Sequence, residues 1–77
     1  MSPILLCELE KGASAEVYSL KTQGPMRRRL LDIGLSPGVV VRALFTACTG
    51  NMTAYLIDGA VIALRYEDAA TVEVVKE

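Results

Sequence analysis

Apolar and polar residues alternate in short runs along this chain of 77 residues, and turn residues separate the runs. The runs are residues 13–20, 39–45, 53–57, 60–66 and 71–75. β-Branched and aromatic residues, which fit a pleated and half-buried surface, are frequent in them. In the valine-rich run, Val39, Val41, Ala43 and Phe45 are expected to share one face. The pattern predicts a mainly β protein of about five strands.

The N-terminal part alternates less clearly than the rest. In the run 13–20, Ala15, Val17 and Ser19 are expected on one face, and Leu20 is expected on the other. The apolar residues 5–6 ahead of this run are expected to pack against the core. Near the other end of the chain, residues 67–70 have the composition of a single helical turn.

One stretch changes to a helical period. Met26, Leu30 and Ile33 recur at i, i+4 and i+7, which places them along one face of a helix. Pro25 suits the first helical position, where its missing N–H is not needed, and Gly34 suits the position after the last turn. The sequence predicts one short α-helix from about residue 25 to about residue 33. Packing has to hold it, because so short a helix is marginal alone.

Two pairs of residues mark tight turns between these elements. Pro37-Gly38 predicts a type II turn, because proline fixes φ at the first central position and glycine takes a positive φ at the second. Asp58-Gly59 lies between two β runs and predicts a two-residue hairpin. A small barrel accounts for these elements economically, since closure removes free sheet edges. An open α+β sheet is the alternative.

Length and composition indicate one domain over residues 1–77 with more apolar residues than its core can hold. The chain is 52% hydrophobic, and a domain this small buries only about 60% of the surface of its unfolded chain. We therefore expect an apolar surface patch for a partner or for weak self-association. No segment has the length of a membrane span, and the N-terminus lacks the features of a secretion signal, so a cytoplasmic location is expected.

Residues for catalysis or metal binding are scarce in the sequence. It contains no histidine, which is the usual general base near neutral pH and the commonest metal ligand. Cys7 and Cys48 lie far apart and favour free thiols in a reducing compartment over a zinc site. The acidic pair Glu67-Asp68 fits a solvated turn better than a cation site. The sequence indicates a protein that is not an enzyme, with no catalytic, cofactor-binding or metal-ligating residues.

The one run of like charge is Arg27 to Arg29 on the predicted helix. At 100° per residue these side chains spread over about 200°, so they cannot all point the same way. A solvated outer face, a docking face for an acidic partner and a nucleic-acid contact all remain open. With 8 basic and 9 acidic residues, the chain lacks the basic excess of a general nucleic-acid binder. The candidate partner surface comprises Arg27, Arg28, Arg29, Thr49, Gly50, Asn51 and Met52, because interfaces are often built from loops and exposed charges.

Several short motifs also follow one another in a fixed order. They are Leu9-Glu10-Lys11-Gly12, Arg29-Leu30, Gly34-Leu35, Pro37-Gly38 and Ile62-Ala63-Leu64-Arg65, followed by an Ala-containing turn and a Val-rich strand. In this order the chain resembles the FeoA family, from about residue 9 to about residue 75. The family's glycines and prolines carry over as turn residues only, together with the hairpin turn: Gly34, Pro37, Gly38, Asp58 and Gly59.

The resemblance implies an SH3-like barrel without a cofactor. It also implies contact with FeoB, the membrane transporter of ferrous iron that carries a cytoplasmic GTP-binding domain. The protein would then assist or regulate iron uptake and reach the membrane only through this partner. The alternatives are a free-standing relative of the C-terminal domain of metal-dependent repressors, a small nucleic-acid-binding barrel, and a metal sensor or carrier.

Overall fold

The computed structural model describes residues 2–46 and 50–77. In chain order the elements are strand β1 (Ile4–Leu5), the 3-10 helix η1 (Leu6–Glu8), β2 (Ser14–Leu20), α1 (Pro25–Asp32), β3 (Val40–Thr46), β4 (Met52–Ile57), β5 (Ala60–Arg65), α2 (Tyr66–Ala69) and β6 (Val72–Lys76). The mainly β prediction is confirmed, and each predicted strand and helix lies within one or two residues of its expected bounds. The additional strand is β1, at apolar residues that were expected only to pack.

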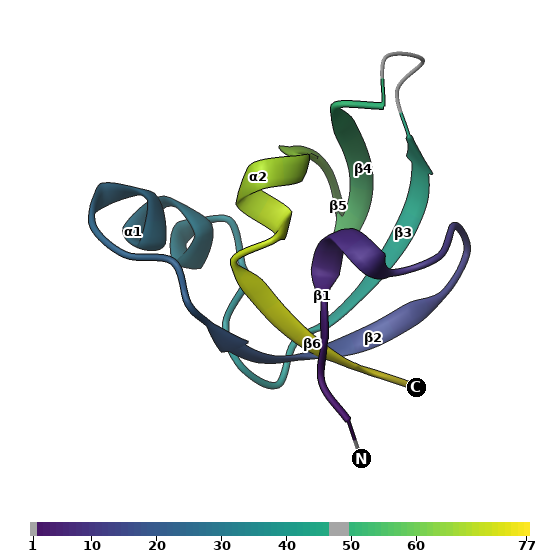
Figure 1. Ribbon diagram of the computed structural model, residues 1–77, viewed down its shortest axis with the longest axis horizontal. Helices are drawn as coiled ribbons and strands as arrows, with labels where there is room; N and C mark the ends of the chain where they lie inside the picture. The colour runs from purple at the N-terminus through teal and green to yellow at the C-terminus, as the bar shows by residue number, and fades with distance from the viewer. Residues whose placement is uncertain (1, 47–49) are drawn as a thin grey trace.

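Within the described residues, the six strands form one antiparallel sheet in the order β1-β6-β2-β3-β4-β5. Figure 1 shows the sheet curled around a core, with α1 standing to one side. The sheet is not closed, because β1 and β5 are its end strands and do not pair with each other. The expectation of full closure is wrong for a local reason. β5 continues directly into α2 and β1 continues directly into η1, and α2 contacts η1 across the open seam.

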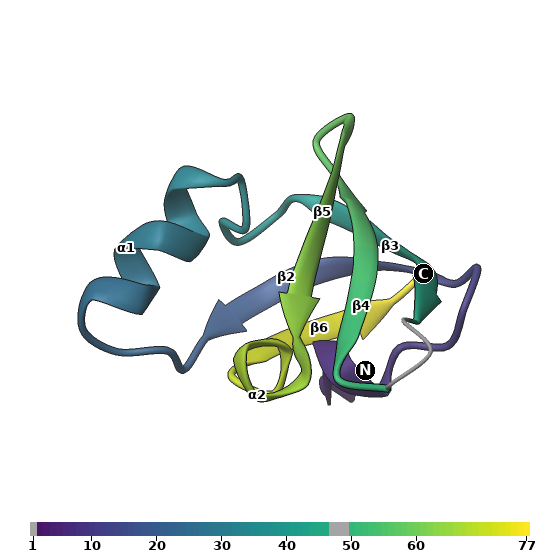
Figure 2. The ribbon, with the colours of Figure 1, turned by 90° about the horizontal axis from the view of Figure 1, so that it is seen from above.

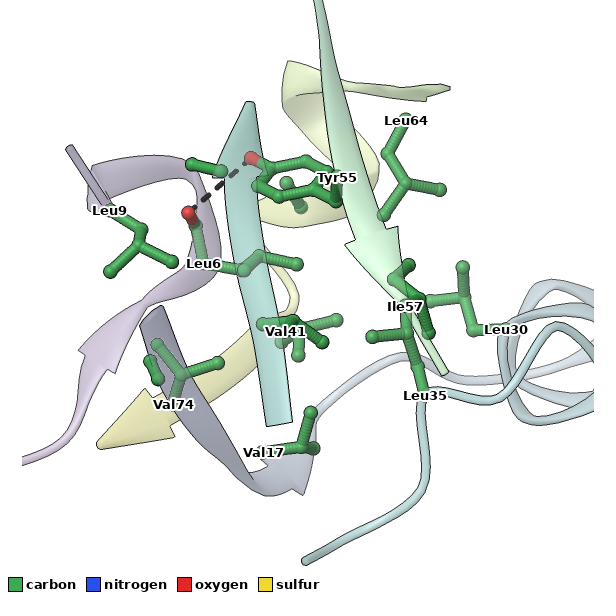
Figure 3. Close-up of a cluster of buried hydrophobic side chains, with 14 of the residues drawn as sticks. Leu6, Leu9, Val17, Leu30, Leu35, Val41, Tyr55, Ile57, Leu64 and Val74 are labelled. Atoms are coloured by element: carbon green, nitrogen blue, oxygen red, sulfur yellow. Dashed lines mark hydrogen bonds between the residues drawn. The ribbon is translucent and has the colours of Figure 1, made fainter. Parts of the chain in front are cut away.

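Tyr55 belongs to the core and is the largest fully buried side chain among the described residues. Figure 3 shows its hydroxyl donating a hydrogen bond of 3.4 Å to the Leu6 carbonyl oxygen. The core also fixes α1. The Leu30 side chain is 1% exposed, and Met26 and Ile33 pack against the same cluster, as the helical period predicts. The helix is therefore held by one apolar face.

Two β-bulges shift the alternation that the sequence predicts. Between Ala43 and Phe45 the pairing of β3 with β4 slips by one residue, so Phe45 turns outward and is 57% exposed. A second irregularity in β2, between Val17 and Ser19, places Leu20 instead of Ser19 on the buried face. The predicted faces are wrong at these positions because one extra residue reverses every side chain beyond it.

The end of α1 is a Schellman motif built on Gly34. The Gly34 N–H donates to the Leu31 carbonyl at 3.1 Å, and the Leu35 N–H donates to the Leu30 carbonyl at 3.0 Å. Gly34 has a φ of +106°, which L-residues rarely adopt. Leu30 and Leu35 are both buried, so the apolar contact that accompanies this motif is part of the core.

Substitution of Gly34 by alanine is expected to lower the free energy of unfolding by more than the same change at Gly38. Both glycines have a positive φ, of +106° and +95°, and each substitution costs about 1–3 kcal/mol in backbone strain. Only at Gly34 does a Cβ meet a neighbour, the Ile57 Cγ2 at 3.3 Å. Urea denaturation of both variants checks this. Equal losses would show that strain alone sets the cost and that the Ile57 contact adds nothing.

The two predicted turns lie at the same end of the sheet, because the start of β3 pairs with the end of β4, with Val41 opposite Ile57. The Val39 N–H donates to the Ser36 carbonyl at 3.1 Å, and Gly38 has a φ of +95°, as a type II turn requires. Asp58 and Gly59 have φ values of +49° and +82°, which is the type I′ geometry that suits the twist of a hairpin. Together these turns fix the position of the β4–β5 hairpin beside α1.

Candidate functional site

The three arginines of α1 have three different environments. Arg27 points back along the chain, where its Nη1 donates to the Leu20 carbonyl at 2.9 Å. Arg28 forms an exposed ion pair with Asp32, with 3.8 Å between Nε and Oδ1. Arg29 has no ion-pair partner among the described residues. The run is therefore divided between a structural hydrogen bond, a surface pair and one available guanidinium.

The loop part of the predicted surface is only partly described. Thr49 lies outside the described residues, as does Cys48. Gly50 and Asn51 are exposed, and the Asn51 carbonyl accepts a hydrogen bond of 2.9 Å from the Tyr66 N–H. Met52 is the first residue of β4, and its side chain is 37% exposed. The loop is thus joined to the start of α2 through its backbone.

A groove lies between α1 and β5. We call it the α1–β5 groove; its volume is about 340 Å³. Figure 2 shows α1 to one side of β5, and α2 at the end of that strand. Most of the lining residues are apolar, but polar and charged atoms make up the larger part of the lining surface. The residues that characterise it are Met26, Arg29, Ile33, Met52, Ile62 and Asp68.

The structure therefore brings together two of the predicted partner residues, Arg29 and Met52, on one concave surface. A second, neighbouring hollow of about 590 Å³ shares Met52 and Arg65 with the groove and extends the surface to Asn51. Arg27 and Arg28 do not line either hollow. Whether this surface binds a partner remains a prediction.

Charges at the groove are weakly compensated. Arg65 pairs with Glu67 at 3.7 Å, but both side chains are more than two-thirds exposed, so this pair contributes little. The Asp68 carboxylate has no ion pair among the described residues. A guanidinium on the helix wall and a carboxylate at the far end can both take part in charge-assisted hydrogen bonds to a ligand.

Cys7 and Tyr66 meet at the open seam of the sheet. Cys7 is a free, half-buried thiol at η1. A hydrogen bond in which the Tyr66 hydroxyl donates toward the Cys7 sulfur is the main cause that raises the pKa of Tyr66 above the ordinary value. The contact joins η1 to α2, so it has a structural explanation.

The described residues contain no group of three or more His, Cys, Asp or Glu side chains placed to hold a metal ion. In the same part of the chain, no helix is long and apolar enough to cross a membrane. What the described surface offers chemically is binding: a cleft of mixed polarity with apolar side chains, a cation, an anion and the backbone of a strand.

Sequence reasoning missed the residues that β5 and α2 contribute to the groove. Ile62, Ala63 and Asp68 line the groove. The sequence pattern predicted only a strand and a helical turn at these positions. One signal for them was present. The run Ala60–Leu64 is apolar at every position, which is unusual for a strand with one solvated face.

Comparison with known proteins gives the relatives of this chain. A model of the FeoA domain family matches residues 4–76. The solution structure of the FeoA protein from Chlorobium tepidum has a TM-score of 0.89 and 32% identity, covering 95% of this chain and 70% of that one. The FeoA protein of Stenotrophomonas maltophilia, crystallised with zinc and described as a procaryotic SH3 domain protein, has a TM-score of 0.79 and 27% identity over 96% of this chain and 89% of that one.

The fold also occurs inside larger proteins. A manganese-dependent transcriptional repressor has a TM-score of 0.89 and 25% identity over 100% of this chain, which spans only 38% of the repressor. No curated protein sequence matches the chain. The family model covers almost the whole sequence, and the Chlorobium tepidum protein shares both its fold and 32% of its residues. On these grounds the chain belongs to the FeoA domain family.

Proposed function

We propose that this protein is a non-enzymatic accessory protein of bacterial ferrous-iron uptake, acting in the cytoplasm by contact with FeoB. The observation that carries the proposal is the family match over residues 4–76. The similar protein of Stenotrophomonas maltophilia has been suggested to be a ferrous iron transport activating factor. The GTP-binding domain of the transporter, on the cytoplasmic side, is the part within reach of such a partner.

The α1–β5 groove supports contact as the mode of action. It combines apolar side chains with Arg29, a charge that has no ion-pair partner among the described residues. Interfaces are typically built from apolar side chains together with a few polar groups that fix the partner's orientation. Arginine is favoured there because its planar guanidinium pairs with carboxylates at two points.

The test is recovery of the full-length transporter from detergent-solubilised host membranes by the tagged protein. Arg29→Gln is expected to weaken the affinity for the transporter at least about tenfold, because a hydrogen bond to a charged group contributes ~1.5–3 kcal/mol. Less transporter is then recovered. Arg28→Gln is the matched control. It removes the same charge from the same helix, but its side chain pairs with Asp32 and does not line the groove. Recovery is expected to stay unchanged for this control.

Each other outcome contradicts part of the proposal. Equal losses for both variants would mean that net charge matters and the groove does not. Unchanged recovery with Arg29→Gln would exclude this residue from the interface. Capture of ribosomal or other nucleic-acid complexes in place of a transporter would favour the nucleic-acid-binding barrel.

A second candidate function rests on the similarity to the manganese-dependent repressor, at 25% identity over the whole of this chain. In that case the protein is a free-standing relative of the C-terminal domain of such repressors, and its partner is a regulator and not a transporter. The same pull-down separates the two candidates, because the identity of the captured protein differs.

A further inference from the structure

The outer edge of β5 is free in this sheet. β5 is an end strand and pairs only with β4 among the described strands. Ile57 and Ala60 flank a two-residue turn, so they form a hydrogen-bonded pair, and the pairs alternate from there. At the other end of the hairpin, the Tyr66 N–H donates a hydrogen bond to the Asn51 carbonyl at 2.9 Å, as this alternation of hydrogen-bonded pairs requires. The backbone groups of Val61, Ala63 and Arg65 therefore point away from β4.

The β5 strand itself also lacks the sequence features that natural proteins use to prevent strand addition. Such features are charges or prolines within the edge strand, bulges, and very short strands. The opposite edge is β1, which has two residues. β5 has six residues, no proline, and a single charge at its last position, Arg65. An exposed edge of this kind is suited to pairing with another extended chain.

The free edge opens onto the α1–β5 groove. Ala63 and Arg65 line the groove, whereas Val61 does not. The volume of about 340 Å³ is at the lower end of the range for binding pockets, which runs from about 300 to 1,000 Å³. It can hold the side chains of a few residues of extended chain, but not a folded domain. The apolar wall, with Met26 and Ile33 from α1, would face the alternate side chains of such a segment.

The charge of the helix wall indicates the chemistry of the occupant. Arg29 has no ion-pair partner among the described residues, while Arg27 and Arg28 are engaged with Leu20 and Asp32. A carboxylate on the incoming segment would give this guanidinium a partner in a partly desolvated site. We propose that an extended, acidic segment of a partner protein pairs with Ala63 and Arg65 as an additional strand and places an apolar side chain in the α1–β5 groove.

This inference deepens the proposed function and rests on it for the identity of the partner. Its test does not require the transporter. The probe is a short synthetic peptide of alternating glutamate and leucine, titrated into the isotope-labelled protein. We expect saturable shifts of the Ala63 and Arg65 amide signals, and at least about tenfold slower hydrogen exchange at the Ala63 amide. A slowing of this size is expected when the amide gains a hydrogen-bond partner, and the N-methylated control peptide separates strand pairing from contact by side chains.

Two control peptides define the recognition. The same peptide with N-methylated amides on its pairing edge keeps every side chain but loses its backbone donors, and we expect it to bind at least about tenfold more weakly. A peptide of alternating lysine and leucine reverses the charge and is expected to bind more weakly than the glutamate peptide. Equal binding of the N-methylated peptide would overturn strand addition, and equal binding of the lysine peptide would overturn the acidic assignment.

Two protein variants test the position on the edge. Ala63→Pro removes an outward-pointing N–H within the groove and is expected to abolish binding. Val61→Pro removes another outward N–H of the same strand, outside the groove, and is expected to retain it. If Ala63→Pro does not fold, the comparison of the methylated and unmethylated peptides still decides the question.

The outcomes also separate this inference from the proposed function. Recovery of FeoB without peptide binding would overturn strand addition and leave the proposed function standing. Peptide binding without recovery of FeoB would do the reverse. A third outcome is slower exchange at the Ala63 amide when only the protein concentration is raised, together with dimer formation in sedimentation. This outcome would assign the edge to a second copy of the chain and overturn the choice of partner.

Discussion

Replacing Tyr55 with alanine is expected to lower the free energy of unfolding by about 3–5 kcal/mol, the usual cost of deleting a large buried aromatic side chain. Tyr55 is 1% exposed and is the largest of the fully buried side chains that the structure describes. A domain of this size has a total stability of roughly 4–12 kcal/mol. The loss is therefore a large share of the total. A urea denaturation curve measures it directly.

Tyr55→Phe is the matched control, because it keeps the ring and removes only the hydroxyl. The lost hydrogen bond to the Leu6 carbonyl is long, at 3.4 Å, so we expect a loss of about 1 kcal/mol or less. If both variants lose the same stability, packing of the ring is not the main contribution of this residue.

The same control has a second readout at alkaline pH. Burial raises the pKa of Tyr55 above the ordinary value of 10.0. The folded state therefore favours the protonated hydroxyl. This contribution to stability is fully present below about pH 10 and is lost as the pH rises through the raised pKa. Between pH 9 and pH 11, the free energy of unfolding of Tyr55→Phe is expected to fall less than that of the protein that keeps Tyr55. The difference between the two losses is set by the size of the rise in the Tyr55 pKa.

Leu30→Ala is the second substitution with a large expected effect, about 2–5 kcal/mol. Leu30 is the one fully buried residue of α1 and also supplies the carbonyl that accepts the Leu35 N–H in the helix cap. A helix this short does not persist without packing. We expect the amides of α1 to exchange with solvent much faster than those of β3 and β4, because the helix opens before the sheet does.

Leu31→Ala provides the comparison within the same helix. Leu31 is half-buried and packs only at the margin of the core, so its truncation is expected to cost less and to leave the exchange of α1 amides slow. Faster exchange of sheet and helix amides together in Leu30→Ala would contradict the expected local opening and show that α1 and the sheet unfold as one unit. Because α1 forms one wall of the α1–β5 groove, we also expect Leu30→Ala to weaken binding of a partner there.

Local sequence signals predicted the parts of this fold that local chemistry determines. Pro25 and Gly34 delimit α1, and the hairpin at Asp58-Gly59 lies where the two β runs meet. The misses have a common cause. Phe45 and Leu20 lie just beyond bulges, and a bulge is decided by the partner strand and not by the residues that it displaces.

The candidate site could be predicted only in part, for a related reason. Arg29 and Met52 were visible as an exposed charge and a loop residue, but adjacent arginines are indistinguishable until their neighbours are known. Leu20 and Asp32 engage Arg27 and Arg28 and leave Arg29 available. The residues of β5 line the groove because the sheet is open at this strand, and the sheet is open there because β5 runs directly into α2. Neither feature has a local signature.

The pairing of β1 with β6 has a practical meaning for how this module can be attached to other molecules. Ile4 lies opposite Val74, and Figures 1 and 2 both place the chain ends away from α1. A polypeptide can therefore enter and leave the domain at neighbouring points without crossing the groove. A similar fold spans 38% of the longer chain of a manganese-dependent transcriptional repressor. The position of the chain ends further means that a resin tether or a fluorophore at either terminus leaves the proposed docking surface accessible.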